Sequence, residues 1–166
     1  MVVSNAGDWT RNLIQTAQRQ ALTSENEAEV QMHFYTKSHP KPGVLSLSLL
    51  FPRILILTTG SGIGPALSSL LERPAAQHAR LVWSARAPER TYGAAIMALV
   101  HEADPEALVL DTQAMGRPDL LEVAWGMCRA ERADAVFVLS NERVTRMVVG
   151  GLEGRGVRAY GPIWDS

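Results

Sequence analysis

The sequence predicts an α/β fold over residues 53–166: a doubly wound, five-stranded parallel sheet with helices on both faces. Short apolar runs rich in branched and aromatic residues alternate there with segments of helical length. Most of these runs are continuously apolar, which is typical of strands that are covered on both faces. A glycine-rich turn follows the first run. A chain of 166 residues accommodates one such domain and an appendage.

The expected elements follow one another at short intervals. The strands are RILILTT (53–59), ARLVWSA (79–85), ALVLD (107–111), DAVFVLS (134–140) and VRAYGPI (157–163). The helices between them are expected at 64–71, 92–102, 118–131 and 142–153. Thr91 is expected to cap the second helix, and Pro118 to lie in the first turn of the third. Right-handed crossovers are the default for such connections.

Residues 1–52 have a different pattern and are expected to form an N-terminal appendage. MVVSN (1–5) and EVQMHFYTK (29–37) resemble strands, and DWTRNLIQTAQRQ (8–20) resembles a helix capped by Asp8. Two or three elements cannot bury a core, so this strand–helix–strand segment needs another surface. SHPKPGV (38–44) is the expected joint.

The composition of the chain indicates which kinds of ligand or partner it can bind. Sixteen Lys and Arg and seventeen Asp and Glu are scattered along the chain and give a net charge of −1, which does not favour nucleic acid. Pro52 and Arg53 interrupt the longest apolar stretch, so membrane insertion is not expected. One cysteine and four dispersed histidines predict neither a disulfide nor a metal site. We expect a cytoplasmic chain that binds a small molecule, a nucleotide, a partner protein or a second copy of itself.

The turn TTGSGIGP (58–65, the glycine loop) follows a strand and opens a helix, the context of a phosphate-binding loop. Gly60, Gly62 and Gly64 allow close approach of the backbone to a ligand. Backbone N–H groups and the positive end of a helix beginning near Gly64 would then face an anion such as a pyrophosphate. The spacing matches neither G-x-G-x-x-G nor the P-loop, so NTP hydrolysis is not expected. A turn that binds nothing is the alternative.

The glycine loop resembles the pyridine-nucleotide loop of the ferredoxin–NADP reductase superfamily. NAGDWTRNL (5–13) is similar to the GDWT segment of NADPH oxidases and ferric reductases, and VLSNERVTRMVVGGLEGRGVRAYGPIWDS (138–166) resembles fungal and bacterial reductase-like proteins. The resemblance implies a Rossmann-like nucleotide-binding domain after the remnant of a flavin-domain end. In that superfamily a flavin-binding β-barrel precedes the nucleotide domain, and hydride passes from NADPH to FAD between the two domains. Its segments are missing here, so we expect NADP(H) without tightly bound FAD, and a partner that supplies the barrel.

The resemblance also assigns roles to individual residues. It implies that the pyrophosphate is held by Thr59, Gly60, Ser61, Gly62, Ile63, Gly64 and Pro65, and the ribose and 2′-phosphate by Ser84, Arg86 and Arg90. Residues 140–142 (SNE) replace the superfamily's usual C-G-P near the nicotinamide. Ser140 and Asn141 are catalytic candidates there, and Trp164 lies where reductases place an aromatic ring over the flavin.

Each of these roles has a simpler alternative. Asp111, which follows the third strand, is a candidate acid–base residue or a turn cap. Ser140 or Asn141 would cap a helix, Arg86 and Arg90 would be solvated surface charges, and Trp164 would cover the sheet edge.

The sequence is compatible with three functions. The first is an NADP(H)-binding reductase domain that acts with a partner or a substrate. The second is a redox-inactive biosynthetic enzyme of the isomerase, cyclase or condensation type that uses the old nucleotide crevice. The third is a non-catalytic binding module.

Overall fold

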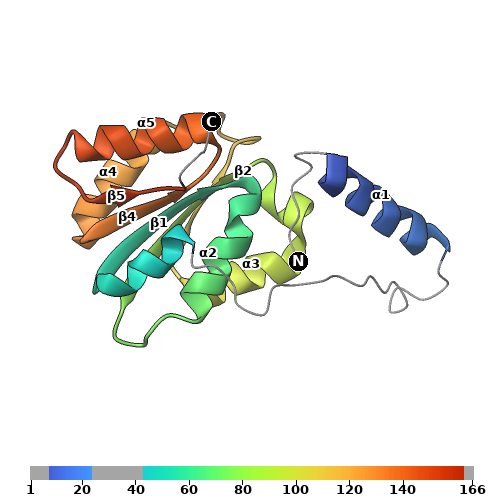
Figure 1. Ribbon diagram of the computed structural model, residues 1–166, viewed down its shortest axis with the longest axis horizontal. Helices are drawn as coiled ribbons and strands as arrows, with labels where there is room; N and C mark the ends of the chain where they lie inside the picture. The colour runs from blue at the N-terminus through green and yellow to red at the C-terminus, as the bar shows by residue number, and fades with distance from the viewer. Residues whose placement is uncertain (1–7, 24–42, 163–166) are drawn as a thin grey trace. The chain divides into compact units, whose positions relative to one another are not determined.

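A computed structural model describes residues 8–23 and 43–162 (Figure 1). The chain divides into two compact units, Met1–Lys41 and Pro42–Ser166, and the division falls within the expected joint at 38–44. In the first unit, α1 (Asp8–Thr23) confirms the predicted helix, and Arg11 Nη1 lies 3.0 Å from Asp8 Oδ1. The strands predicted at 1–5 and 29–37 lie outside the described residues. No helix in the described ranges is long and apolar enough to cross a membrane.

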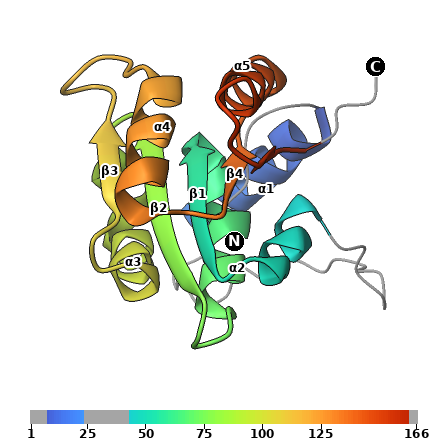
Figure 2. The same ribbon diagram turned by 90° about the vertical axis from the view of Figure 1, so that its left-hand side faces the viewer.

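The second unit contains the predicted parallel sheet (Figure 2). Its five strands lie in the order β3-β2-β1-β4-β5, and every neighbouring pair is parallel. The strands are β1 (Arg53–Thr59), β2 (His78–Ala85), β3 (Leu108–Asp111), β4 (Ala135–Leu139) and β5 (Ala159–Tyr160). β5 is shorter than the predicted run 157–163. Pro162 lacks the N–H that a longer ladder requires.

Helices cover both faces of the sheet, as predicted. The first face packs against α2 (Ile63–Leu71), α3 (Pro88–Ala103) and the 3-10 helix η2 (Val44–Leu50). The second face packs against α4 (Leu120–Glu131) and α5 (Glu142–Glu153). Successive residues of β1 alternate between the two cores, with Ile54 and Ile56 in the first and Leu55 and Leu57 in the second. Both faces are therefore apolar, which explains the continuous hydrophobic run.

Two predicted helix starts were wrong by a few residues. α3 begins at Pro88, and Gly93 interrupts it with φ 82°; Thr91 does not cap it, because its hydroxyl donates to Arg86 O at 2.8 Å. α4 begins at Leu120 after Asp119, whose carboxylate accepts the N–H groups of Leu121 and Glu122. Pro118 therefore precedes the cap instead of occupying the first turn.

The segment around η2 belongs to the α/β unit, although its sequence pattern grouped it with the appendage. Gln77 Nε2 donates to Ser48 O at 2.7 Å and to Phe51 O at 2.9 Å. The Phe51 ring also meets Phe137 edge-on, with 6.1 Å between centroids. The buried Gln77 amide and the aromatic contacts of Phe51 therefore attach this segment to the first face of the sheet.

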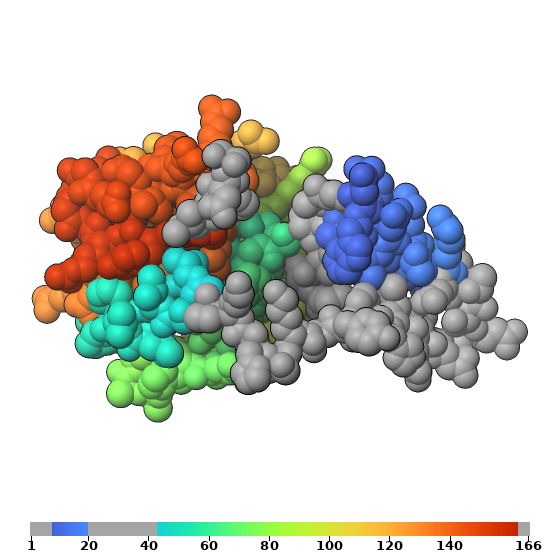
Figure 3. Space-filling view, in the orientation of Figure 1, coloured from blue at the N-terminus to red at the C-terminus, as the bar shows by residue number. Residues whose placement is uncertain are grey.

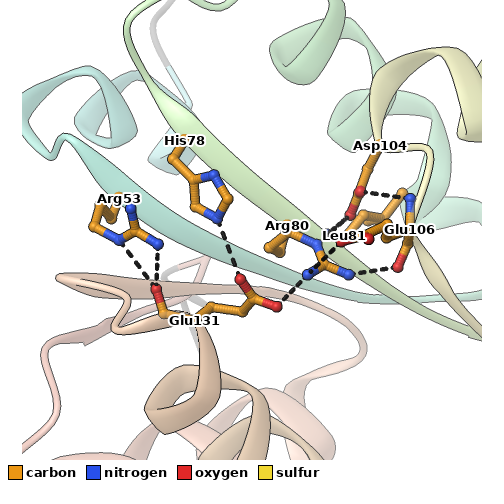
Figure 4. Close-up of polar contacts among 7 residues, drawn as sticks. All are labelled: Arg53, His78, Arg80, Leu81, Asp104, Glu106 and Glu131. Atoms are coloured by element: carbon orange, nitrogen blue, oxygen red, sulfur yellow. Dashed lines mark hydrogen bonds and ion pairs between the residues drawn. The ribbon is translucent and has the colours of Figure 1, made fainter.

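Charged side chains gather at the edge where β1 and β2 begin, and Figure 4 shows them. We call this group the amino-edge cluster. At its centre, Arg80 Nε lies 3.1 Å from Asp104 Oδ2, and Arg80 also pairs with the Glu131 carboxylate. The Arg80 side chain is 10% exposed and that of Asp104 is 5% exposed. The other members are Arg53, His78 and Glu106.

The cluster satisfies backbone groups as well as charges. Asp104 Oδ2 accepts the N–H of Leu81 at 2.8 Å, and Glu131 O accepts both Nε and Nη2 of Arg53. Burial lowers the pKa of Arg80, but its hydrogen bond to Asp104 and the surrounding carboxylates outweigh burial and leave the pKa raised. Arg80 is therefore a permanent cation that compensates the carboxylates around it.

Candidate functional site

The sheet order creates a topological switch point between β1 and β4. The chain proceeds from β1 through β2 to β3 on one side, and then crosses back to β4 on the other side. The segments that follow β1 and β4 therefore lie at the same, carboxyl edge, with Thr58 opposite Leu139 in the ladder. In open α/β sheets, ligands bind outside the carboxyl ends at such a point. The glycine loop and residues 140–142 are the two segments in question.

The glycine loop needs glycine at two positions for local reasons. A 3-10 turn, η3 (Gly60–Gly62), connects β1 to α2, which begins at Ile63, one residue before the predicted start. Gly60 has φ +53°, in the left-handed region. A Cβ on Gly62 would lie 2.9 Å from Leu139 O and would overlap Thr58 Oγ1. Glycine at position 62 thus allows the loop to pack directly against β4.

The buried side chain of Trp83 forms a hydrogen bond to the glycine loop. Its indole Nε1 donates to Gly60 O at 3.0 Å, and the side chain is fully buried. Tyr92 meets it edge-on, with 5.1 Å between ring centroids, and burial raises the pKa of the Tyr92 hydroxyl. The sequence analysis did not connect Trp83 with the loop. Strand register could have indicated this contact, because Trp83 on β2 pairs with Thr58 on β1, directly before the loop.

The ends of β1 and β4 are joined by hydroxyl groups. Thr59 Oγ1 and Ser140 Oγ are 2.6 Å apart, and Thr58 Oγ1 donates to Leu139 O at 3.0 Å. Asn141 Oδ1 accepts the N–H of Val144 at 3.0 Å and caps α5. The structure thus brings Ser140 to the glycine loop and gives Asn141 the capping role that was its alternative.

The residues after β2 lie at the same edge, one strand further along. Ser84 is buried and pairs in register with Thr59. Arg90 Nη2 donates to Gln113 Oε1 at 2.7 Å. Arg86 is exposed, and its guanidinium makes no hydrogen bond or ion pair with any residue that the structure describes. Among the described residues, all guanidinium donors of Arg86 are free, whereas Arg90 uses one donor on Gln113.

Asp111 holds the turn between β2 and α3. Ala87 adopts φ 43°, a strained value for a residue with a Cβ, and its N–H donates to Asp111 Oδ1 at 2.9 Å. Asp111 Oδ1 also accepts the N–H of Gln113 at 2.8 Å. These backbone hydrogen bonds, that from Ala87 first, lower the pKa of Asp111. This geometry is that of a turn cap, the alternative foreseen for Asp111. Trp164 lies outside the described residues.

An apolar groove of about 1280 Å³ begins beside the glycine loop, and sequence reasoning did not foresee it. Its walls come from η2, α2 and the ends of β4 and β5, and its lining includes Pro65, Leu139 and Tyr160. These walls are far apart in the chain. The groove could not be predicted from the sequence, because one of its walls exists only when η2 packs against the α/β unit.

A family model described as the C-terminal domain of adenylate-forming reductase 03009 matches residues 44–166. The chain belongs to this family. Two curated relatives, adenylate-forming reductases 03009 and 06235 of Coprinopsis cinerea, are each 36% identical to it over 166 residues. The match covers 100% of this chain and 15% of each relative, so the chain spans about a seventh of their length.

A solved structure shares the fold of this reductase C-terminal domain. It is the C-terminal domain of a hydrogenase from Pyrococcus furiosus, with a TM-score of 0.50 and 13% identity, covering 67% of this chain and 90% of that one. At this level of identity the likeness concerns the fold alone. The comparisons thus place the chain in a reductase family, as its sequence indicated, while its membership in the ferredoxin–NADP reductase superfamily stays a prediction.

Proposed function

We propose that this domain binds NADP(H) at the carboxyl edge of its sheet and is the pyridine-nucleotide-binding part of a reductase. The observation that carries the proposal is the position of the glycine loop, which lies at the switch point and leads directly into α2. The positive end of the α2 dipole favours an anion at this position. Membership in a family of reductase C-terminal domains supports the redox context.

Residues 59–65 would hold the pyrophosphate, mostly through backbone N–H groups. The Thr59–Ser140 pair adds a side-chain donor, because each hydroxyl has one hydrogen and only one hydrogen is shared between the two oxygens. The second hydrogen is available to a ligand oxygen. Ser140 is therefore the one catalytic candidate at the switch point that we retain for contact with the reactive end of the nucleotide.

Arg86 would recognise the 2′-phosphate of NADP(H), with Ser84 and Arg90 beside it. Its guanidinium has no partner among the described residues and can form two parallel hydrogen bonds with phosphate, whereas one donor of Arg90 is already engaged by Gln113. We expect Arg86→Ala to weaken NADPH binding by about ten-fold, in keeping with the loss of a charged hydrogen bond, and to leave NADH binding unchanged. Arg90→Ala should have the smaller effect in the same calorimetric titrations.

Ser61 offers a direct test of anion binding that spares the fold. It lies in η3 and is partly exposed, so Ser61→Asp places a carboxylate beside the proposed pyrophosphate. Asp near a helix N-terminus does not destabilise the helix, so the melting temperature should be unchanged or slightly raised. NADPH affinity should fall at least ten-fold in Ser61→Asp and stay within about two-fold in Ser61→Ala. No binding of millimolar NADPH by the wild type, or equal affinities in both variants, would refute the proposal.

A redox-inactive enzyme is the second candidate, and the role of Asn141 favours it. Residues 140–142 replace a motif that the resemblance places near the nicotinamide, and Asn141 is engaged in capping α5. Assays of hydride transfer separate the two candidates. Oxidation of NADPH in the presence of an acceptor supports the reductase, and turnover of a substrate without any nucleotide supports the alternative.

A further inference from the structure

The groove beside the glycine loop is separate from the proposed nucleotide site. Of the residues assigned to NADP(H), only Pro65 lines the groove. Its other walls are η2, one side of α2, and the segment that follows β5. Figure 3 shows η2 in cyan on the face where these walls meet. A volume of about 1280 Å³ exceeds that of many small-molecule pockets, which measure about 300–1,000 Å³.

The walls of the groove are mainly apolar and carry one charge. Val44 and Leu45 and the ring of Tyr160 contribute apolar surface, and the polar side-chain groups besides Glu72 are serine hydroxyls and the Tyr160 hydroxyl. Glu72 is the only ionisable carboxylate of the lining, and the lining contains no Lys, Arg or His within the described part of the chain. The groove therefore has a net negative charge.

This charge pattern selects against anions. An anionic ligand would lose hydration among apolar side chains without gaining a cationic partner, and it would be repelled by Glu72. The phosphates of NADP(H) therefore belong at the glycine loop and outside the groove. An uncharged apolar molecule gains from burial of its apolar surface at no comparable cost.

We propose that the groove binds an uncharged apolar molecule, such as a medium-chain or aryl alcohol or aldehyde. An alcohol and its aldehyde are a pair of compounds that an NADP(H)-dependent reductase can interconvert. The interpretation of the groove as a substrate site therefore rests on the proposed function. Pro65 and Leu139 place one end of the groove beside the glycine loop and the Ser140 hydroxyl. A molecule lying in the groove would thus extend toward the proposed site of the reactive end of the nucleotide.

The charge argument can be tested with 1-octanol and octanoate, which differ chiefly in charge. Titrations followed by NMR should show octanol bound by the wild type, with octanoate about ten-fold weaker because the anion loses hydration among apolar side chains and is repelled by Glu72. Glu72→Gln should strengthen octanoate binding about two- to three-fold by removing the repulsion, should leave octanol unchanged, and should retain a preference for octanol because octanoate still loses hydration in the groove. Glu102→Gln, an exposed substitution on α3, is the matched control and should retain the ten-fold preference. Equal binding of both compounds by the wild type would overturn the proposal.

A second pair of variants tests the location. Ser68 is exposed and lines the groove, so Ser68→Trp should obstruct the part of the groove along α2 and reduce octanol binding at least five-fold. Ala98→Trp, at an exposed position of α3, should bind octanol like the wild type. A concentration-dependent dimer that is abolished in Ser68→Trp, without octanol binding, would overturn the proposal in favour of a second copy of the chain.

Parallel NADPH titrations separate the two proposals. If NADPH binds and octanol does not, the groove proposal fails and the proposed function stands. If octanol binds with the predicted charge preference and NADPH does not, the ligand class stands, but the groove is no longer a reductase substrate site.

Discussion

The two edges of the sheet use opposite chemistry. At the amino edge, Arg80 is surrounded by carboxylates, and Asp104 and Glu131 also bond to backbone or side-chain donors. At the carboxyl edge, the contacts between β1 and β4 are made by the neutral hydroxyls of Thr58, Thr59 and Ser140. Arg86 is a charged residue near the carboxyl edge, and its guanidinium donors are free among the described residues.

The difference teaches which edge is committed to the fold. A buried cation with its carboxylates is costly to disturb, because removal of one partner leaves the others uncompensated. Hydroxyl pairs and glycine turns can accommodate a ligand oxygen at small cost, and an uncompensated helix N-terminus attracts one. We therefore expect substitutions at the amino edge to change stability alone, and those at the carboxyl edge to change binding as well.

Arg80→Met should have the largest effect on stability. It leaves Asp104 and Glu131 without their cation, so the free energy of unfolding in urea should fall by about 3–5 kcal/mol. NADPH affinity of the folded variant should be unchanged. Arg146→Met is the matched control: its exposed pair with Glu142 should contribute about 0.5 kcal/mol or less. A loss below about 1 kcal/mol for Arg80→Met would contradict this account of the amino edge.

Gly62→Ala should have an intermediate effect and should alter both properties. Its Cβ would meet Leu139 O and Thr58 Oγ1, so the loop must move away from β4 at a cost of about 1–3 kcal/mol. NADPH binding should weaken because the loop is displaced. Gly126→Ala, at a position on α4 with nothing within 4 Å, should instead stabilise by up to about 1 kcal/mol. Urea denaturation measures the stability of both variants, and calorimetry measures their NADPH affinity. Unchanged stability in Gly62→Ala would contradict the claim that close packing against β4 requires glycine at this position.

Asp111→Asn should have the smallest effect, and one that depends on pH. The pKa of Asp111 is lowered in the folded state, so its contribution to stability is present above the unfolded pKa of about 3.9 and is lost as pH falls below it. The difference in unfolding free energy between wild type and Asp111→Asn should be constant from pH 7 to about pH 5 and should shrink toward pH 3. A difference that grows in acid would exclude the capping role.

The sequence predicted the sheet well because its strands are buried on both faces. β1 coincides with the predicted range 53–59, and α5 coincides with 142–153, where Asn141 supplies a recognisable cap. Such elements are determined by local pattern and by capping chemistry. The start of α3 was harder to predict, because Pro88, Thr91 and Gly93 are competing boundary signals close together in the chain.

Features that depend on tertiary contacts could not be predicted. The Thr59–Ser140 hydrogen bond joins positions 81 residues apart, and the position of η2 depends on Gln77 and Phe51. The amino-edge cluster joins the start of β2 to the ends of α3 and α4, and nothing in the linear spacing of Arg80, Asp104 and Glu131 indicates it. The side chains of Asp111 and Asn141 act as caps, and their proposed catalytic roles stay predictions.

The central claim, that ligand binding belongs to the carboxyl edge, is tested most directly by NMR titration of the 15N-labelled chain with NADPH. We predict saturable shifts of the backbone amides of residues 59–64, 84–87, 89–90 and 140–142. Amides around His78, Arg80, Asp104 and Glu131 should remain unshifted and provide the internal control. Shifts concentrated at the amino edge, or no saturable shift at millimolar NADPH, would contradict the claim.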